Sequence, residues 1–385
     1  MTNFIFRAPP IIRFGPGAAL KVGEEARRLG AKKALLITDA FLASAGVIDP
    51  IRQELVAKGL EVAVFSEVNT EPTIDHVAGS LKLQKAQKSD LLVAVGGGSP
   101  IDVAKATSFL ATNPGVIQDY MGLEKIPHNA LPLIAVPTTA GTGSEATATT
   151  IITDVAANVK MLIISSRIMP QVALVDPNLT LGMPKGLTAA TGLDALTHAI
   201  EAYVSKKAQP ITDLLALAAI RVLVKNLPVA FHEPGNLEAR SQTLLGALQA
   251  GLAFSNSSVA LVHGMSRPIG ALFHVPHGIS NAALLGKVMD FSLPGDYARY
   301  AEVARAMGLP DLGEDQKTAQ SGATRVSQLI AELEVPTLTA LGVTKAKLEP
   351  VVAKMAEDAL ASGSPANNPR LATKEEIISL YQACL

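Results

Sequence analysis

Four residues with metal-binding side chains occupy two segments of the second half of the chain. Asp194 and His198 stand four apart in TGLDALTHAIEAY, so a helix projects both side chains from one face. His263 and His277 lie fourteen apart in HGMSRPIGALFHVPHG, where a helix followed by a turn would supply two ring nitrogens. A carboxylate with imidazoles and no thiolate suits a borderline divalent ion such as Fe(II) or Zn(II). The spacing therefore predicts a metal site.

The spacing leaves the ligand set open. His274 is close to His277 and is an equally good ligand by position. A histidine in an apolar run such as that around His263 can also be a hydrogen-bonded core residue. Metal binding and a purely structural role both remain compatible with the pattern.

A glycine-rich turn in the first half has the composition of an anion site. The apolar run Leu91–Val95 leads into GGGSPID at 96–102 and then into a helical pattern. We expect Ser99 as the N-cap, Pro100 at the first helical position and Asp102 in a capping-box role. Glycines and a helix N-terminus together favour a diphosphate. The turn matches neither a P-loop nor G-x-G-x-x-G, so a tight turn without a ligand is the alternative.

A second polar loop, PTTAGTGSE at 137–145, follows the next predicted strand. Asp39, at the end of an earlier strand, is a candidate partner for a ribose. Ligands of α/β proteins bind at the carboxyl ends of parallel strands, so the loops together favour a nucleotide.

These residues require two kinds of scaffold. Short apolar runs alternate with helical spacing up to about residue 180, which predicts an α/β domain with a parallel sheet over residues 1–180. Beyond residue 180, apolar residues recur at intervals of three and four positions, which predicts an all-α domain over residues 181–385. The segment DPNLTLGMPKG at 176–186 is the expected boundary.

Composition excludes several classes of protein. The chain has 385 residues, with 33 Lys and Arg against 34 Asp and Glu, so no net charge attracts nucleic acid or an anionic membrane. Its single cysteine, Cys384, allows no internal disulfide or thiolate cluster and fits a reducing compartment. The first residues lack a signal-peptide pattern, and the uncharged stretch 241–266 carries polar residues that suit a buried helix. We expect a cytoplasmic protein that binds neither nucleic acid nor membrane.

With these motifs in view, the sequence resembles the iron-containing alcohol dehydrogenase family. GGGSPIDVAK, PTTAGTGSE, TGLDALTHAIEAY and HGMSRPIGALFHVPHG occur in the family's order over nearly the whole chain. The resemblance implies a Rossmann-type, dehydroquinate synthase-like α/β domain, a helical metal-binding domain and a homodimer. It also implies hydride transfer between NAD and a small alcohol or aldehyde at a divalent metal, with Fe(II) favoured and Zn(II) possible.

The resemblance assigns roles to individual residues. Metal ligation falls to Asp194, His198, His263 and His277. The expected cofactor contacts are Asp39, Gly97, Gly98, Ser99, Asp102, Thr138, Thr139, Thr142, Thr149 and Lys160. An acidic Asp39 beside the adenosine ribose favours NAD over NADP. His263, His277, Arg267 and Phe254 are expected around the reacting atoms.

Two departures from the family pattern bear on specificity. Arg267 replaces a histidine that many members carry near the substrate, and a guanidinium there would pair with a substrate carboxylate or else point to a structural partner. Glu71 stands in TEPT where PNPT is common, which weakens one cofactor contact. Three alternatives therefore stay open: a hydroxyacid–oxoacid transhydrogenase, a lyase of the dehydroquinate synthase type, and a non-catalytic metal- or nucleotide-binding scaffold.

Overall fold

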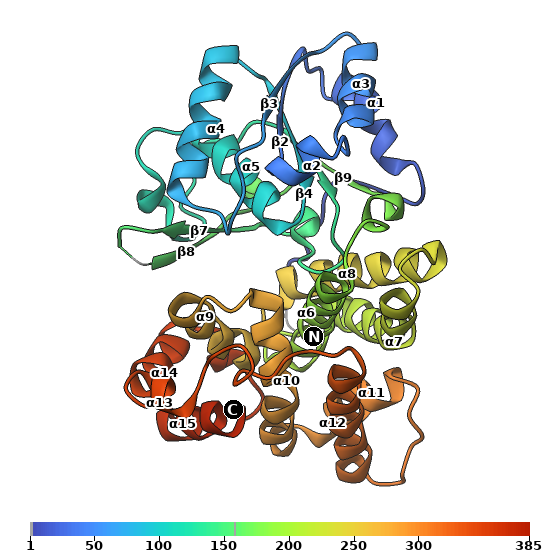
Figure 1. The fold of residues 1–385 in the computed structure, drawn as a ribbon, viewed down its shortest axis with the longest axis vertical. Coiled ribbons are helices and arrows are strands. Elements are labelled where there is room, and N and C mark those ends of the chain that lie inside the picture. The colour runs from blue at the N-terminus through green and yellow to red at the C-terminus, as the bar shows by residue number, and fades with distance from the viewer. Residues whose placement is uncertain (1–2, 158) are drawn as a thin grey trace. The chain divides into compact units, whose positions relative to one another are not determined.

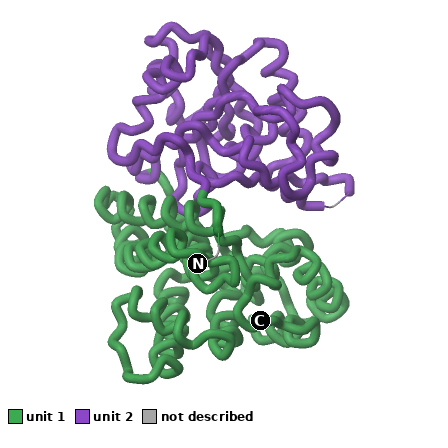
Figure 2. Tube along the Cα trace, turned by 180° about the vertical axis from the view of Figure 1, so that it is seen from behind, with its two compact units in different colours: residues 1–6, 182–385 green, residues 7–181 purple. Residues whose placement is uncertain are grey.

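The computed structural model describes residues 3–157 and 159–385, which form two compact units (Figure 2). Residues Arg7–Leu181, purple in Figure 2, form what is called the first unit below. The second unit, green in Figure 2, joins the described part of Met1–Phe6 to Gly182–Leu385. The N-terminal segment groups with the second unit, whereas the division expected at residue 180 places it in the first. One reason is that the backbone oxygen of Ile5 accepts a hydrogen bond from Gln209 Nε2 at 3.4 Å.

A six-stranded parallel sheet forms the centre of the first unit (Figure 1). Its strand order is β1-β9-β6-β4-β2-β3, and every pairing is parallel. The strands are β1 (Ile11–Phe14), β2 (Lys33–Ile37), β3 (Glu61–Phe65), β4 (Leu91–Gly96), β6 (Leu133–Pro137) and β9 (Val172–Val175). A smaller sheet, in the order β5-β8-β7, contains β5 (Gly122–Leu123), β7 (Thr149–Asp154) and β8 (Val159–Ile164).

Both faces of the large sheet are buried, as its continuous apolar strands predict. Alternate residues of β2 show this, because Leu36 packs in one hydrophobic cluster and Leu35 in another. The Leu36 cluster includes helices α1 (Val22–Arg28) and α3 (Asp49–Ala57). The Leu35 cluster includes α4 (Ile74–Gln87) and α5 (Gly98–Leu110). The predicted α/β fold class is confirmed.

Strand order brings three loops to one edge of this sheet. β2, β4 and β6 are neighbours, and the chain crosses over β2 between β3 and β4. Asp39 follows β2 and caps the short helix α2 (Ala40–Ser44), while the glycine-rich turn follows β4 and the threonine-rich loop follows β6. Because these strands are parallel, all three loops lie at the carboxyl edge, near a topological switch point.

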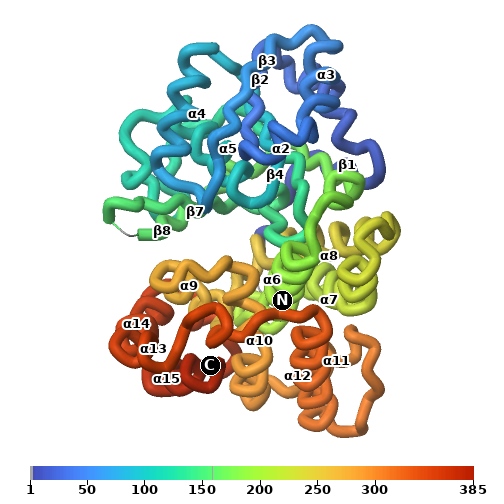
Figure 3. Tube along the Cα trace, viewed as in Figure 1, coloured from blue at the N-terminus to red at the C-terminus, as the bar shows by residue number. Residues whose placement is uncertain are grey.

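Every helix numbered from α6 onward belongs to the second unit, and its core is helix against helix. Figure 3 follows these helices from green to red, and α9 and α14 lie side by side in it. Helix α7 packs against α6 and α8, and α10 packs against α6, α9 and α12. The helices are α6 (Lys185–Val204), α7 (Pro210–His232), α8 (Leu237–Ser257), α9 (Leu261–Phe273), α10 (His277–Ser292), α11 (Tyr297–Ala306), α12 (Asp315–Glu332), α13 (Lys345–Leu348), α14 (Val352–Ala361) and α15 (Lys374–Ala383).

One helix in the described ranges, α7, is long and apolar enough to cross a membrane, and α8 with α9 passes the same test only as a pair bent by 102°. The pair covers the uncharged stretch 241–266 of the sequence. Core helices of globular proteins share this length and composition, and α7 packs against α6 and α8.

Candidate metal and nucleotide sites

Three helices of the second unit bring the four predicted metal ligands together. Asp194 and His198 lie one turn apart on α6, His263 lies on α9, and His277 begins α10. One ligand atom each from Asp194, His263 and His277 lie within 4.8 Å of one another. His198 Nδ1 is 4.0 Å from Asp194 Oδ2, and the His198 ring stacks on His263 with centroids 4.5 Å apart. His274, which spacing also allowed, is an exposed residue outside this group.

A glycine allows α10 to approach α6 closely enough for this arrangement. A Cβ atom on Gly278 would lie 2.4 Å from the backbone oxygen of Ala190, closer than a side chain tolerates. Gly278 follows His277 directly, so contact between the two helix backbones places the His277 ring beside Asp194.

The cluster fits a cation, and the Asn281 side chain provides the observation. Its Nδ2 lies 2.6 Å from Asp194 Oδ1, 3.1 Å from His263 Nε2 and 3.2 Å from His277 Nε2, so three acceptors converge on one donor group. Asn281 is fully buried and its Oδ1 has no hydrogen-bond partner among the described residues. Several buried lone pairs directed at one point are what a divalent metal satisfies.

Glu201 orients one of the rings from behind. It is buried on α6, one turn after His198, and its Oε2 lies 2.6 Å from His263 Nδ1. The same carboxylate accepts from the backbone N–H groups of Ala260 and Val262 at the start of α9. When the proton of the neutral ring is on Nδ1 and hydrogen-bonded to Glu201, His263 Nε2 carries a lone pair that faces Asp194 and His277.

Electrostatics of the cluster favour positive charge. Burial opposes ionisation of Asp194, but the neighbouring His198, His277 and His263 hold the pKa of its carboxyl well below the usual value. Burial likewise lowers the pKa of His263, yet Glu201 and Asp194 outweigh it and raise that pKa to about 9. Two buried carboxylates therefore attract a proton or a metal ion to this point.

Phe254 borders the cluster, and Arg267 lies on the same helix as His263. The Phe254 ring stacks on His198 with centroids 4.2 Å apart. Arg267 lies one turn after His263 on α9, is half-buried, and makes no hydrogen bond or ion pair within the described ranges. Burial lowers the pKa of its guanidinium, while the nearby Glu201 acts in the opposite direction.

In the first unit, the glycine-rich turn lies against the threonine-rich loop. Added Cβ atoms on Gly97 and Gly98 would lie 3.3 Å from Thr139 Oγ1 and 3.0 Å from Thr142 Cγ2. The loops are also tied at their bases, where the Thr138 N–H donates to the Gly96 oxygen at 3.0 Å. The structure therefore joins the two loops that the sequence could relate only by strand order.

The helix after the glycine-rich turn begins differently from the expectation. α5 starts at Gly98 with Gly97 as its N-cap, so the predicted Ser99 cap is wrong. Asp102 makes no capping box, because its carboxylate accepts from Ser144 Oγ at 2.7 Å and from the Ile151 N–H at 2.9 Å. These bonds brace the threonine-rich loop and β7 against α5.

Two buried charged residues near this brace were missed by the sequence analysis. Lys105 Nζ donates to Ser144 Oγ, Thr147 Oγ1 and the Thr149 oxygen at 2.8–3.0 Å. Burial lowers the pKa of Lys105 to about 8 and raises that of Glu145 to about 7, each opposed by the charge of the other. Lys105 follows Asp102 by three residues on α5, a helical spacing that could have pointed to it.

Asp39 and Lys160, two expected cofactor contacts, already have protein partners. Asp39 Oδ1 accepts the N–H of Leu42 at 2.8 Å and caps α2. Lys160 Nζ forms an ion pair with Glu71 Oε2 at 2.6 Å. Glu71, the departure noted in the sequence, is therefore the ion-pair partner of Lys160.

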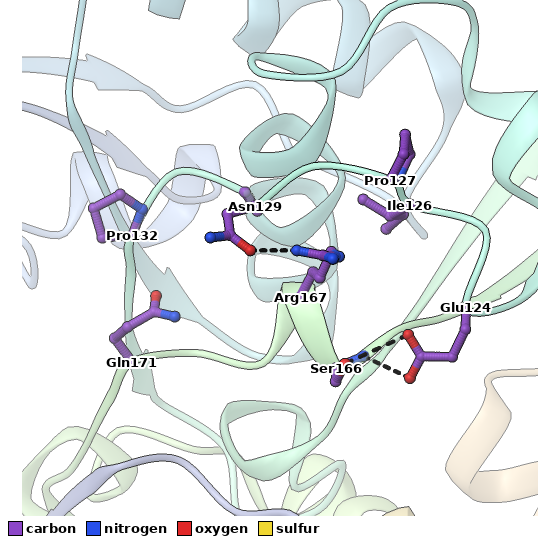
Figure 4. Close-up of a pocket in the computed structure, with 9 residues that line it drawn as sticks. Glu124, Ile126, Pro127, Asn129, Pro132, Ser166, Arg167 and Gln171 are labelled. Carbon is purple, nitrogen blue, oxygen red and sulfur yellow. Dashed lines mark hydrogen bonds between the residues drawn. The ribbon is translucent and has the colours of Figure 1, made fainter.

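The hollow drawn in Figure 4 lies at the opposite end of the strands, because Pro132 and Gln171 precede β6 and β9. Its volume is about 850 Å³, and none of the expected cofactor residues lines it. Arg167 inside it hydrogen-bonds Asn129. This hollow is separate from the carboxyl edge of the sheet.

Comparison with known proteins finds matches over both units of the chain. Residues 9–177 match the model of the iron-containing alcohol dehydrogenase family, and residues 188–385 match the family's C-terminal domain model. The 1,3-propanediol dehydrogenase of Klebsiella pneumoniae is 38% identical over 383 residues, 98% of each chain. A solved 1,3-propanediol oxidoreductase superposes with a TM-score of 0.97 at 38% identity over 100% of both chains. A sulfoacetaldehyde reductase from Bifidobacterium kashiwanohense in complex with NAD⁺ gives 0.90 at 30% identity, over 100% of this chain and 99% of that one.

The chain belongs to the iron-containing alcohol dehydrogenase family. It is an oxidoreductase that acts on CH–OH groups and depends on NAD and a divalent metal.

Proposed function

We propose that Asp194, His198, His263 and His277 hold the metal and that the ion is Fe(II), with Zn(II) as the substitute. The convergence of three ligand atoms on the Asn281 amide carries this proposal. One carboxylate and three imidazoles match the preference of borderline divalent ions. His198 supplies the fourth group from α6, one turn after Asp194.

NAD binds at the carboxyl edge of the large sheet in this proposal. The diphosphate lies on the N–H groups of Gly97, Gly98 and Ser99 at the start of α5, where the helix dipole favours an anion. Thr138, Thr139 and Thr142 supply hydroxyls for the ribose and nicotinamide, as does Thr149. Asp102 contributes through Ser144, which it holds, and Lys160 contributes when it leaves Glu71.

Asp39 selects the cofactor. Its Oδ1 caps α2, and its second oxygen is available to accept from a ribose 2′-OH. A 2′-phosphate would bring like charges together, so NAD is favoured over NADP.

When bound, the metal supplies a Lewis acid at the substrate oxygen and NAD accepts or returns the hydride. The chain's own residues prepare the site for this chemistry. Glu201 fixes the tautomer and plane of His263, while Asn281 orients the Asp194 carboxylate. His277, whose side chain is 39% exposed, marks the open side of the cluster, and Phe254 adds an apolar wall.

A reductase for oxo-acids, or a hydroxyacid–oxoacid transhydrogenase, is the second candidate. The unpaired guanidinium of Arg267 favours it. A structural relative is named a sulfoacetaldehyde reductase, a name that describes an anionic aldehyde as substrate.

We further propose that the enzyme acts in the cytoplasm as a homodimer, without nucleic acid or membrane as partners. The single cysteine and the near-zero net charge support this assignment. Sedimentation of the purified protein tests the dimer.

The test of function is NADH consumption by anaerobically purified, Fe(II)-loaded protein with short aldehydes and oxo-acids. Oxidation that a chelator abolishes and Fe(II) restores is the expected result. Absence of NADH oxidation with every acceptor, in protein that demonstrably holds metal and NADH, would overturn the reductase. Steady turnover of a donor and an acceptor without added NAD would instead establish the transhydrogenase.

A further inference from the structure

Arg267 is an unusual cation for a half-buried position. Elsewhere in the same unit, Arg240, Arg299, Arg305 and Arg370 all donate hydrogen bonds to protein acceptors. Arg267 makes none among the described residues, although burial already disfavours its charge. A half-buried guanidinium with five donors and no protein acceptor among the described residues can form charge-assisted hydrogen bonds with an anionic ligand.

Helix geometry directs this guanidinium toward the metal cluster. Arg267 is four residues after His263 on α9, so the two side chains share one helical face. Helical side chains lean toward the N-terminus of their helix, which carries the guanidinium over the turn that holds His263.

Neighbouring acidic groups leave the Arg267 charge available. Glu201, the carboxylate that acts on it electrostatically, already accepts from His263 Nδ1 and from two backbone N–H groups. Asp194 is held by Asn281 and the histidines. These carboxylates therefore leave Arg267 without a protein partner among the described residues, and the oxyanion of a ligand can take that place.

We propose that Arg267 binds the anionic end of the substrate, so that the enzyme prefers alcohols and aldehydes carrying a carboxylate or a similar oxyanion. This inference rests on the proposed function, because the reacting oxygen of the same molecule lies at the metal cluster. The guanidinium fork matches a carboxylate with two parallel hydrogen bonds, whereas Lys offers a single point charge. Phe254 provides an apolar surface for the carbon chain between the two ends.

The experiment compares aldehydes that differ only in charge. Glyoxylate, 4-oxobutanoate and 5-oxopentanoate are each paired with the uncharged aldehyde of the same length, and kcat/KM is measured with NADH for Fe(II)-loaded protein. We expect the anionic member of at least one pair to be preferred. In Arg267→Met the ratio of kcat/KM for the anionic aldehyde to kcat/KM for the uncharged aldehyde should fall by about 10- to 100-fold. Arg267→Lys should retain part of the preference.

Arg325→Met is the matched control, because Arg325 is also a partly buried arginine and, among the described residues, pairs only with Glu332 of its own helix α12. It should leave the ratio unchanged. Equal loss for charged and uncharged aldehydes in Arg267→Met would overturn the proposal, as would a parent enzyme with no preference in any pair. A weaker NADH complex in Arg267→Met, with the substrate ratio intact, would assign the guanidinium to a cofactor phosphate and also overturn it.

A binding measurement separates this inference from the proposed function. Isothermal titration calorimetry measures the binding of 4-hydroxybutyrate and of 1-butanol to the metal-loaded parent protein and to the metal-loaded Arg267→Met variant. Tight binding of the hydroxyacid that the variant loses supports the anion site even if no aldehyde is reduced. Reduction of uncharged aldehydes alone, with no hydroxyacid binding, confirms the reductase and overturns the anion site.

Discussion

The two clusters handle buried charge in opposite ways. In the α/β unit, Lys105 has three hydrogen-bond acceptors and Asp102 has two donors, so the protein satisfies these groups itself. In the helical unit, three ligand atoms converge on one amide nitrogen, and the amide oxygen of Asn281 has no partner in the described ranges. One cluster is a brace whose charges are satisfied within the protein, and the other leaves buried groups that the proposed metal ion would satisfy.

Substitution of His263 should have the largest effect on the metal cluster. His263→Ala removes a proposed ligand and leaves Glu201 buried without its imidazole partner. We expect loss of the metal and a fall in activity of about a thousandfold or more, because the Lewis acid contributes several kcal/mol. NADH binding, followed by fluorescence, should be unchanged. Full activity in the variant would disprove the metal assignment.

Lys105→Met tests the brace. It leaves the Ser144, Thr147 and Thr149 acceptors unpaired and Asp102 uncompensated, which should destabilise the α/β unit by about 3–5 kcal/mol. Thermal unfolding should show a lower Tm and NADH affinity should fall, while metal affinity in a chelator competition stays at the parent value. Loss of metal binding in this variant would contradict the independence of the two clusters.

Glu145 gives the brace a pH dependence. Its pKa is raised to about 7 by burial, so its protonated form is favoured in the folded protein. A raised pKa adds stability below the unfolded value of 4.5 that is lost as the pH rises through 7. Glu145→Gln removes this loss, so its stability relative to the parent should increase by up to about 3 kcal/mol between pH 4.5 and pH 8. Denaturant unfolding at the two pH values measures it, and a constant difference would refute the buried carboxyl.

Glu201→Gln tests how much the carboxylate behind His263 contributes to metal affinity. An amide cannot accept from His263 and both backbone N–H groups as the carboxylate does, so His263 loses its fixed tautomer. Metal affinity should fall by about 10- to 100-fold in chelator competition. Asp213→Asn, which breaks an ion pair with Arg299 away from the ligands, is the control and should leave metal affinity unchanged. Equal effects in both variants would mean that Glu201 acts only on stability.

The smallest effect is expected at Glu71. Glu71→Gln frees Lys160 from a partly exposed ion pair, which is worth less than about 1 kcal/mol. NADH should bind up to about fivefold more tightly, and the gain should shrink at high salt. Weaker binding would show that Glu71 helps the cofactor rather than competing with it.

Much of the scaffold was predictable because its signals are local. The strand predicted at Leu91–Val95, the strand before the 137–145 loop and the strand that ends near Asp39 are confirmed, since apolar runs depend only on neighbouring residues. The strands β1, β7, β8 and β9 were not predicted. β1 is the edge strand of the large sheet, and β7 and β8 belong to a small separate sheet, where the apolar pattern is weaker.

The sequence alone determined the residue types at the two sites: a carboxylate with histidines at helical spacing, and glycines and threonines after strands. Only the tertiary structure decided which groups meet. Asn281 and Glu201 join the metal cluster, and Lys105 and Asp102 the brace, through contacts between residues 18 to 87 positions apart in the chain. The Ser99 cap was wrong because α5 begins earlier, at Gly98, where the 137–145 loop packs against the glycines. Spacing fixes what one helix face can present, but packing between elements decides what it meets.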